Sequence, residues 1–109
     1  MKSVESIYGL NLLRRAERDL VALLDVAATG SPAQARALAS KFQTQFNRLQ
    51  RYPNSGSPVR GHATQPLGFR FIKVARWLAF YIVDEPVRMI YIHRVLHAKR
   101  DYLAVLSAE

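Results

Sequence analysis

The first third of the chain carries one apolar stripe at helical spacing, preceded by a short apolar stretch. Residues 4–10 predict a first strand, in which Gly9 favours an edge position or a bend. A helix is expected to follow, with Asn11 as its N-cap and Gly30 as its stop. Its buried face is expected to consist of Leu13, Ala16, Leu20, Leu23, Leu24 and Ala27.

A second helix begins with a stronger start signal. Ser31 is the expected N-cap, Pro32 occupies the first helical position, and Gln34 completes a capping box three residues after the cap. The apolar stripe that follows comprises Ala35, Leu38, Ala39, Phe42, Phe46 and Leu49. Because only a few residues separate the two helices, we expect an antiparallel helical hairpin.

The second half of the chain changes from helical to alternating periodicity. Residues 52–68 are rich in proline, glycine, serine and asparagine, and predict one long loop. Residues 70–74 and 77–83 then alternate as strands do, and a tight turn at residues 84–86 leads into a third run, 87–96. These three strands predict an antiparallel β-meander.

The middle strand of this meander is apolar on both faces. One face carries Leu78, Phe80 and Ile82, and the other carries Trp77, Ala79, Tyr81 and Val83. The helical hairpin is expected to cover one face. The second face must be covered by the long loop, by another molecule, or by a C-terminal helix containing Tyr102, Leu103 and Leu106.

Together these elements predict an α+β fold in a single domain of residues 1–109. Its parts are an N-terminal strand, a two-helix antiparallel hairpin packed on a three- to four-stranded mainly antiparallel sheet, and a short C-terminal helix. The chain has no cysteine, which excludes disulfide scaffolds, thiolate zinc sites and cysteine nucleophiles. No stretch approaches the roughly 20 apolar residues of a membrane-spanning helix, so a cytoplasmic protein without membrane contact is expected.

Charge points to an anionic partner. The chain carries 16 Lys and Arg against 8 Asp and Glu, a formal net charge of +8. Each side of Val59 holds 8 basic and 4 acidic residues, so we expect the excess on the folded surface and not in a basic tail. Nucleic acid, an acidic protein and a membrane surface all fit such an excess.

His97 is the one candidate for acid–base chemistry, because histidine exchanges a proton near neutral pH. No partner group is evident beside it, and its alternative role is a structural hydrogen bond that ends the strand. His93 and His62 are not at metal-ligand spacing, and neither a carboxylate dyad nor a phosphate-binding glycine loop is present. We therefore expect no metal and no cofactor.

Basic residues gather near the ends of the predicted strands. They form either a cationic patch for nucleic acid or acidic side chains, or an ordinary solvated surface. Arg94 is in phase with Ile90 and Ile92, so an ion pair with Asp19 or Asp101 is its alternative role. The aromatic residues Trp77 and Tyr91 stack on bases, or else face the core or a partner. The basic set comprises Arg70, Arg76, Arg94, Lys99 and Arg100.

Several short motifs carry a resemblance to a known family. They are residues 16–20, Leu49 with Tyr52, Pro53 and Gly56, Phe69 with Arg70, Phe80 with Tyr81, and residues 94–97 followed by Arg100 and Asp101. In these the chain resembles the RelE/ParE superfamily of bacterial type II toxins, and within it the ParE-like or plasmid-stabilisation branch. The resemblance implies an operon partner, an antitoxin whose C-terminal segment wraps the toxin, and favours that partner as the cover of the second apolar face.

The resemblance leaves two activities to separate. ParE-like members are linked to inhibition of DNA gyrase, whereas RelE-like members cut messenger RNA on the ribosome. In the ribonuclease branch an arginine typically follows the aromatic that opens the middle strand, and a basic or tyrosine residue follows the last strand. Here Leu78 follows Trp77, and Ala98 falls near the later basic position. This departure favours the gyrase-inhibiting branch.

We therefore predict a toxin that binds DNA gyrase without hydrolysing anything and forms a hetero-oligomer with its antitoxin. Direct binding of nucleic acid is a weaker expectation. The alternative is a ribosome-dependent endoribonuclease that uses His97, Arg70 and Arg94, and a third interpretation is a degenerate toxin that only binds its antitoxin. The predicted target- or partner-binding residues are Arg70, Arg76, Trp77, Leu78, Phe80, Tyr91, His93, His97, Lys99 and Arg100.

Overall fold

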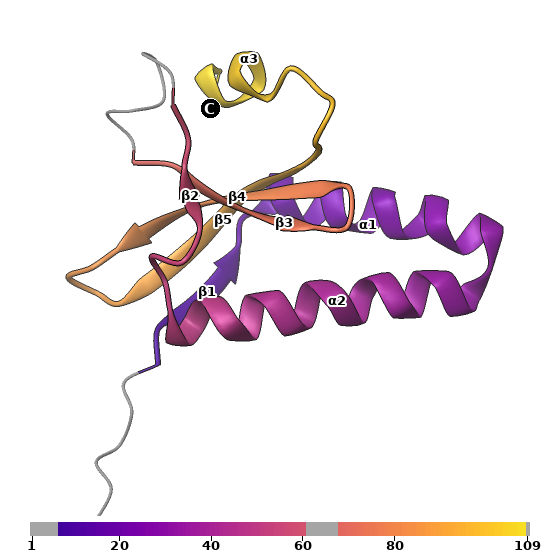
Figure 1. The fold of residues 1–109 in the computed structure, drawn as a ribbon, viewed down its shortest axis with the longest axis horizontal. Coiled ribbons are helices and arrows are strands. Elements are labelled where there is room, and N and C mark those ends of the chain that lie inside the picture. Colours follow the sequence, from indigo (N-terminus) through magenta and orange to yellow (C-terminus); the bar gives the residue numbers. More distant parts are fainter. Residues whose placement is uncertain (1–6, 61–67, 109) are drawn as a thin grey trace, which may run out of the picture.

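The computed structural model of the chain describes residues 7–60 and 68–108. It has an α+β fold in which a helical hairpin packs on one face of a five-stranded sheet and a short C-terminal helix lies over the other (Figure 1). Within the described ranges, no helix is long and apolar enough to cross a bilayer.

The hairpin consists of α1 (Arg14–Gly30) and α2 (Pro32–Arg51), joined by Ser31 alone. The Ser31 hydroxyl accepts a hydrogen bond from the Gln34 N–H at 3.0 Å, which confirms the predicted cap. Its own N–H donates to the Ala27 carbonyl at 3.2 Å, so one residue closes the first helix and opens the second. Three residues of the predicted α2 stripe are the buried residues of that helix: Phe42, Phe46 and Leu49.

The start of α1 differs from the prediction. Its N-cap is Leu13, which has no side chain able to cap, and Asn11 lies in strand β1 (Gly9–Leu12) opposite Tyr91. The first strand thus begins later than expected, and residues 4–6 of the expected strand lie outside the described part. Pairing with the last strand holds residues 9–12 extended, and this overrides the capping preference of asparagine.

The sheet has the order β1-β5-β4-β3-β2. Strands β3 (Arg70–Val74), β4 (Trp77–Asp84) and β5 (Met89–His97) form the predicted antiparallel meander, and β1 runs parallel to β5. The remaining strand, β2 (Ser57–Pro58), lies in the segment that was expected to be irregular, and it pairs with Phe71 and Arg70 of β3. Only two residues pair there, too few for an alternating pattern to show.

Two hydrophobic clusters occupy the two faces of the sheet. Tyr81 and Ala79 face α1 and α2, whereas Leu78 and Phe80 face the C-terminal helix α3 (Tyr102–Ser107). Leu106 of α3 is fully buried in the second cluster, together with Val59 of the long loop and Phe69, which follows that loop. The predicted division of the two faces is confirmed. The chain itself covers the second face, which corrects the preference for a partner there.

Candidate functional site

The end of the sheet near the β3–β4 turn borders a groove of about 260 Å³ against α1. Its walls come from α1 and from the first residue of β4 and the last residues of β5, and its floor is mostly aliphatic. We call it the strand-end groove. It is lined by Asp19, Ala22, Leu23, Val26, Trp77, Val95, Leu96, His97 and Arg100. Three residues predicted to bind a target or partner, Trp77, His97 and Arg100, therefore meet here.

Strand register places the aromatic pair of the groove. Trp77 opens β4 and lies opposite His97, which ends β5. The two rings meet edge to face, with centroids 5.2 Å apart and planes at 78°. His97 Nδ1 accepts a hydrogen bond from the Lys99 N–H at 3.1 Å, the structural strand-ending bond considered from the sequence. Both Lys99 and Arg100 are exposed beyond it, so the groove has an apolar floor and a cationic rim.

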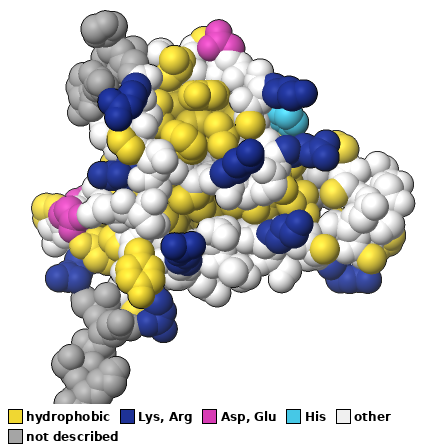
Figure 2. All heavy atoms as spheres, viewed as in Figure 1, with side chains coloured by type: hydrophobic (Ala, Val, Ile, Leu, Met, Phe, Trp, Pro, Cys, Tyr) yellow, Lys and Arg dark blue, Asp and Glu magenta, His cyan; other side chains and the backbone are white. Residues whose placement is uncertain are grey.

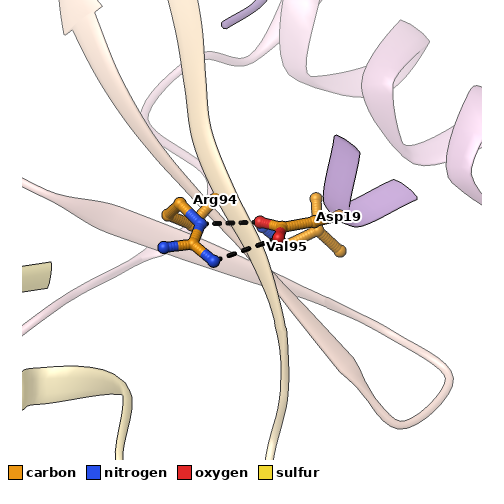
Figure 3. Close-up of polar contacts among 3 residues, drawn as sticks. All are labelled: Asp19, Arg94 and Val95. Carbon is orange, nitrogen blue, oxygen red and sulfur yellow. Dashed lines mark hydrogen bonds and ion pairs between the residues drawn. The ribbon is translucent and has the colours of Figure 1, made fainter. Parts of the chain in front are cut away.

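One wall of the groove rests on an ion pair between α1 and β5 (Figure 3). Arg94 Nε and Nη2 donate to the two carboxylate oxygens of Asp19 at 2.7 and 3.0 Å, and the Val95 N–H donates to the same carboxylate at 2.9 Å. The two side chains are only 13% and 17% exposed. Of the two partners considered for Arg94, Asp19 is the one found. Asp101 instead caps α3 by accepting from the Ala104 N–H at 3.4 Å.

A β-bulge precedes this ion pair. Phe80 pairs with Arg94 and Tyr81 pairs with Ile92, so His93 is the extra residue in β5. Because the bulge shifts the alternation by one residue, the phase that relates Arg94 to Ile92 in the sequence does not hold in the strand. His93 packs its ring edge to face on Phe69, with centroids 5.0 Å apart.

Arg70 lies away from the strand-end groove and holds the loop after α2. Its Nη1 donates to the Gly56 carbonyl at 2.8 Å and to the Asn54 carbonyl at 3.4 Å. The Tyr81 hydroxyl donates to the Pro53 carbonyl at 2.8 Å and accepts from the Gly56 N–H at 3.0 Å. Burial raises the pKa of this hydroxyl above its usual value near 10, while the Gly56 N–H and Arg70 oppose the rise.

The remaining predicted binding residues are spread over the sheet. Leu78 and Phe80 are 6% and 0% exposed, and the Tyr102 ring of α3 lies 5.2 Å from that of Phe80. Tyr91 is partly buried in β5 between β1 and β4. Arg76 precedes Trp77, and its carbonyl accepts a hydrogen bond from the Ala98 N–H at 2.9 Å. The strand-end part of the set is therefore Arg76, Trp77, His97, Lys99 and Arg100.

The three residues of the ribonuclease interpretation are not assembled into one site. Arg70 pairs with Tyr81, four residues along β4 from the Trp77–His97 pair, which is about 13 Å of strand. Arg70 binds loop carbonyls, Arg94 binds Asp19, and His97 Nδ1 binds the Lys99 N–H. In the described part of the chain, no three His, Asp or Glu side chains are grouped as metal ligands.

The α1 side of the groove was not anticipated from the sequence. Asp19, Ala22, Leu23 and Val26 follow a three- and four-residue spacing, with Leu23 belonging to the buried stripe of the same helix and the other three lying beside it. Val26 is 70% exposed, although it is a large aliphatic residue in a helix. A second, incomplete apolar stripe beside the core stripe was the signal that could have revealed this wall.

Comparison with known proteins gives a consistent family signal. The family model described as ParE toxin of type II toxin-antitoxin system, parDE, matches residues 10–102. Thirteen chains of solved structures also match. No curated protein sequence gives a significant match.

Two of the solved structures give the extent of the likeness. A chain of the toxin-antitoxin complex RelBE2 from Mycobacterium tuberculosis is 26% identical, with a TM-score of 0.61, over 84% of this chain and 98% of that one. A chain of the chromosomal ParDE TA system from P. aeruginosa has a TM-score of 0.67 over 86% of this chain and 99% of that one. Its identity is 23%, so it supports the fold alone.

Proposed function

Because the chain belongs to the ParE toxin family of type II toxin-antitoxin systems, we propose that it inhibits DNA gyrase by protein–protein binding and is neutralised by a cognate antitoxin. In this proposal the toxin hydrolyses nothing. The strand-end groove is the surface that binds protein, and its aromatic pair and cationic rim are the contacts that select the partner. The ribosome-dependent ribonuclease is the competing activity.

The geometry of the polar residues is the observation that favours binding over catalysis. A ribonuclease needs a proton-transfer group beside cations that stabilise a developing phosphate charge. Here Arg70 of β3 and His97 of β5 lie on opposite sides of β4 and are offset by about 13 Å along the strand direction, and Arg94 is neutralised by Asp19. The groove instead offers a packed aromatic pair, aliphatic side chains and exposed cations, which are typical of protein interfaces.

The same features favour an antitoxin segment with an apolar anchor flanked by carboxylates. Val26 and Trp77 provide apolar contact, while Lys99 and Arg100 provide charge that attracts acidic side chains. The RelBE2 structure from Mycobacterium tuberculosis is a toxin-antitoxin complex, and this chain aligns with 98% of its matched chain. That relationship supports an antitoxin as the natural occupant.

Parallel assays of the free protein test the proposed target. We expect loss of gyrase supercoiling with unaffected cell-free translation, and the opposite result would refute the gyrase assignment. His97→Ala should retain most of the inhibition, because the proposed mechanism needs no proton transfer at this ring. Strong loss of toxicity in a folded, antitoxin-binding His97→Ala variant would instead support the ribonuclease. If neither activity is inhibited, the chain is a degenerate toxin.

Two valines of α1 form a matched pair for testing the groove. Val26 lines it, whereas Val21 does not, and the two are 70% and 56% exposed. Val26→Asp should weaken binding of the purified antitoxin about 10-fold, because an apolar contact of roughly 1.4 kcal/mol is replaced by a charge. Val21→Asp should change it less than about twofold. Equal effects in a titration calorimetry experiment would place the antitoxin elsewhere.

A further inference from the structure

The positive charge of the chain is concentrated in one long segment. Residues 26–83 contain eight of the 16 Lys and Arg and none of the eight Asp and Glu. The two flanking segments are each balanced, with four cations and four acids. The equal halves on either side of Val59 conceal this distribution, because each half combines part of the acid-free segment with a neutral flank. The cations of the segment are Arg36, Lys41, Arg48, Arg51, Arg60, Arg70, Lys73 and Arg76.

Part of this segment forms a continuous depression between α2 and the neighbouring loop and β3 strand. Three clefts adjoin there, two of about 230 Å³ and one of about 580 Å³. Two of them share Gln45 and Lys73, and two share Arg48 and Ser55. We call the whole the basic trough and define it by Lys41, Gln45, Arg48, Arg51, Tyr52 and Lys73. Among the described residues that line it, every charged one is a cation.

Helical spacing aligns the cations of the trough. Lys41, Gln45 and Arg48 lie four and three residues apart on α2 and therefore share one face. From Lys41 to Arg51 the helix rises about 15 Å. Figure 2 shows Lys and Arg side chains across the face that includes α2, with acidic side chains only near its margins. The Lys and Arg side chains that line the trough therefore attract a negatively charged chain to this face.

The other lining groups suit a sugar–phosphate backbone. Serine and threonine hydroxyls, which donate to phosphate oxygens, come from Ser40, Thr44, Ser55 and Ser57. Tyr52 lies at the end of the trough beyond α2 and is 60% exposed, so its ring is available to a base. Among the large apolar or aromatic residues exposed in the described chain, it is the one that lines the trough.

We propose that the basic trough binds a single strand of nucleic acid, with Lys41, Arg48 and Lys73 at its phosphates and Tyr52 stacked on a base. A helical or extended peptide requires accessible apolar anchors. The strand-end groove offers the exposed Val26, whereas Tyr52 is the one large apolar or aromatic side chain lining the trough that is exposed, since its other large apolar lining residues, Leu49, Phe71, Ile72 and Val74, are buried or partly buried. Single-stranded nucleic acid needs a cationic groove and an aromatic platform, and both are present. The inference is independent of the gyrase proposal, because the two surfaces share no residue.

Fluorescence anisotropy with a labelled 12-nucleotide DNA strand and its RNA counterpart tests the proposal on the full chain. Three phosphate contacts predict a slope of about −2 in a plot of log affinity against log salt, or roughly 20-fold weaker binding at 200 mM than at 50 mM salt. The matching duplex should bind more weakly, because its bases are not available to Tyr52. Absence of saturable binding at 50 mM salt, or tighter binding of the duplex, would overturn the proposal.

Matched variants separate the trough from general electrostatics. The triple variant Lys41→Gln, Arg48→Gln and Lys73→Gln should lose at least about 20-fold in affinity and nearly all of the salt slope. The control triple Arg14→Gln, Arg18→Gln and Arg36→Gln removes the same charge from exposed positions outside the trough and outside the strand-end groove, and should lose less than about threefold. Similar losses in the two variants would refute a localised site.

Two further measurements exclude simpler explanations. Tyr52→Ala should weaken binding about 10-fold without changing the salt slope, since stacking involves no charge. Polyglutamate is the competitor that stands for an acidic protein. If it displaces the strand at equal charge concentration, the trough is a site for acidic polypeptide and the proposal fails. Thermal unfolding of each variant verifies that it is folded at the assay temperature.

Discussion

The strand-end groove and the basic trough lie against different helices of one hairpin, and they differ in chemistry. The α1 surface has an aliphatic wall of Ala22, Leu23 and Val26. Its basic residues are balanced by Asp19 and neighbouring acidic residues. Helix α2 has no acidic residue and lines a trough whose charged groups, in the described part of the chain, are all cations. A net charge of +8 therefore describes neither surface. One small fold can present a surface suited to protein and another suited to a polyanion.

The largest expected effect comes from the wall of the strand-end groove. Asp19→Ala leaves Arg94 without its carboxylate and the Val95 N–H without its acceptor, in a site that is mostly buried. Breaking such a pair should lower the free energy of unfolding by about 3 kcal/mol. Urea denaturation measures it, with Asp25→Ala on the exposed side of α1 as a control expected to stay within about 0.5 kcal/mol.

The same variant sharpens the comparison. Below its unfolding temperature, Asp19→Ala should bind antitoxin more weakly and still bind the nucleic-acid strand. The hydrogen bonds of Asp19 join α1 to Arg94 and Val95 of β5, whereas the trough is formed by α2 and β3. Equal loss of both activities would mean that the two surfaces depend on one another.

Gly56→Ala should have the second largest effect and act on the trough. A Cβ atom at Gly56 would lie 2.5 Å from the Tyr81 hydroxyl and 2.6 Å from the Phe71 carbonyl oxygen, and the latter is backbone that cannot move aside alone. We expect a loss of about 2 kcal/mol and weaker nucleic-acid binding, with antitoxin binding retained. Gly30→Ala is the control, because its Cβ would meet the flexible end of Gln34. If both variants unfold at the wild-type denaturant concentration, the close packing at Gly56 is not structurally important.

The smallest effect concerns the tyrosine behind the trough. Tyr81→Phe leaves the Pro53 carbonyl and the Gly56 N–H without their partner and should cost about 1 kcal/mol at pH 8. The raised pKa of Tyr81 means that the folded protein keeps a proton that the unfolded chain releases above about pH 10. The stability linked to this proton is complete below that pH and is lost as pH rises through the folded-state pKa.

Urea denaturation at pH 8 and at pH 10.5 should therefore show the difference between wild type and Tyr81→Phe becoming smaller at the higher pH. The pKa of Tyr8 is also raised, chiefly by its hydrogen bond to Glu85, so it titrates in the same direction. The same measurement on Tyr8→Phe shows how much of the change in stability with pH comes from Tyr8. A difference that is constant between the two pH values would contradict the role of the Tyr81 proton.

The regular elements of the fold could be predicted because their signals are local. Ser31 caps α2 through a residue three positions away, and the alternation of β4 separates its two faces without reference to other strands. β1 was harder to place, because its extent depends on β5, about 80 residues later. The bulge at His93 was not predictable for the same reason, since it exists only relative to β4.

The candidate surfaces could be predicted only in part. Trp77, His97 and Arg100 were selected from one strand end and do share a groove, because register joins residues at the ends of adjacent strands. Leu78 and Phe80 were selected as apolar, and the sequence alone could not decide that α3 would bury them. The acid-free segment was visible in the sequence, but its trough depends on how α2 packs beside β3.

The parallel pairing of β1 with β5 also has a kinetic consequence. Gly9 pairs with Met89, and Asp19 pairs with Arg94, so neither contact can form before the ribosome has reached residues 89 and 94. At 5–20 residues per second, the ribosome needs about 4 to 16 seconds to connect these partners. The α1–α2 hairpin, in contrast, consists only of residues 14–51 and can form earlier. A nascent or prematurely terminated chain that stops before residue 89 therefore carries the trough helix without a finished strand-end groove, and becomes competent to bind through that groove only after Arg100 has been added.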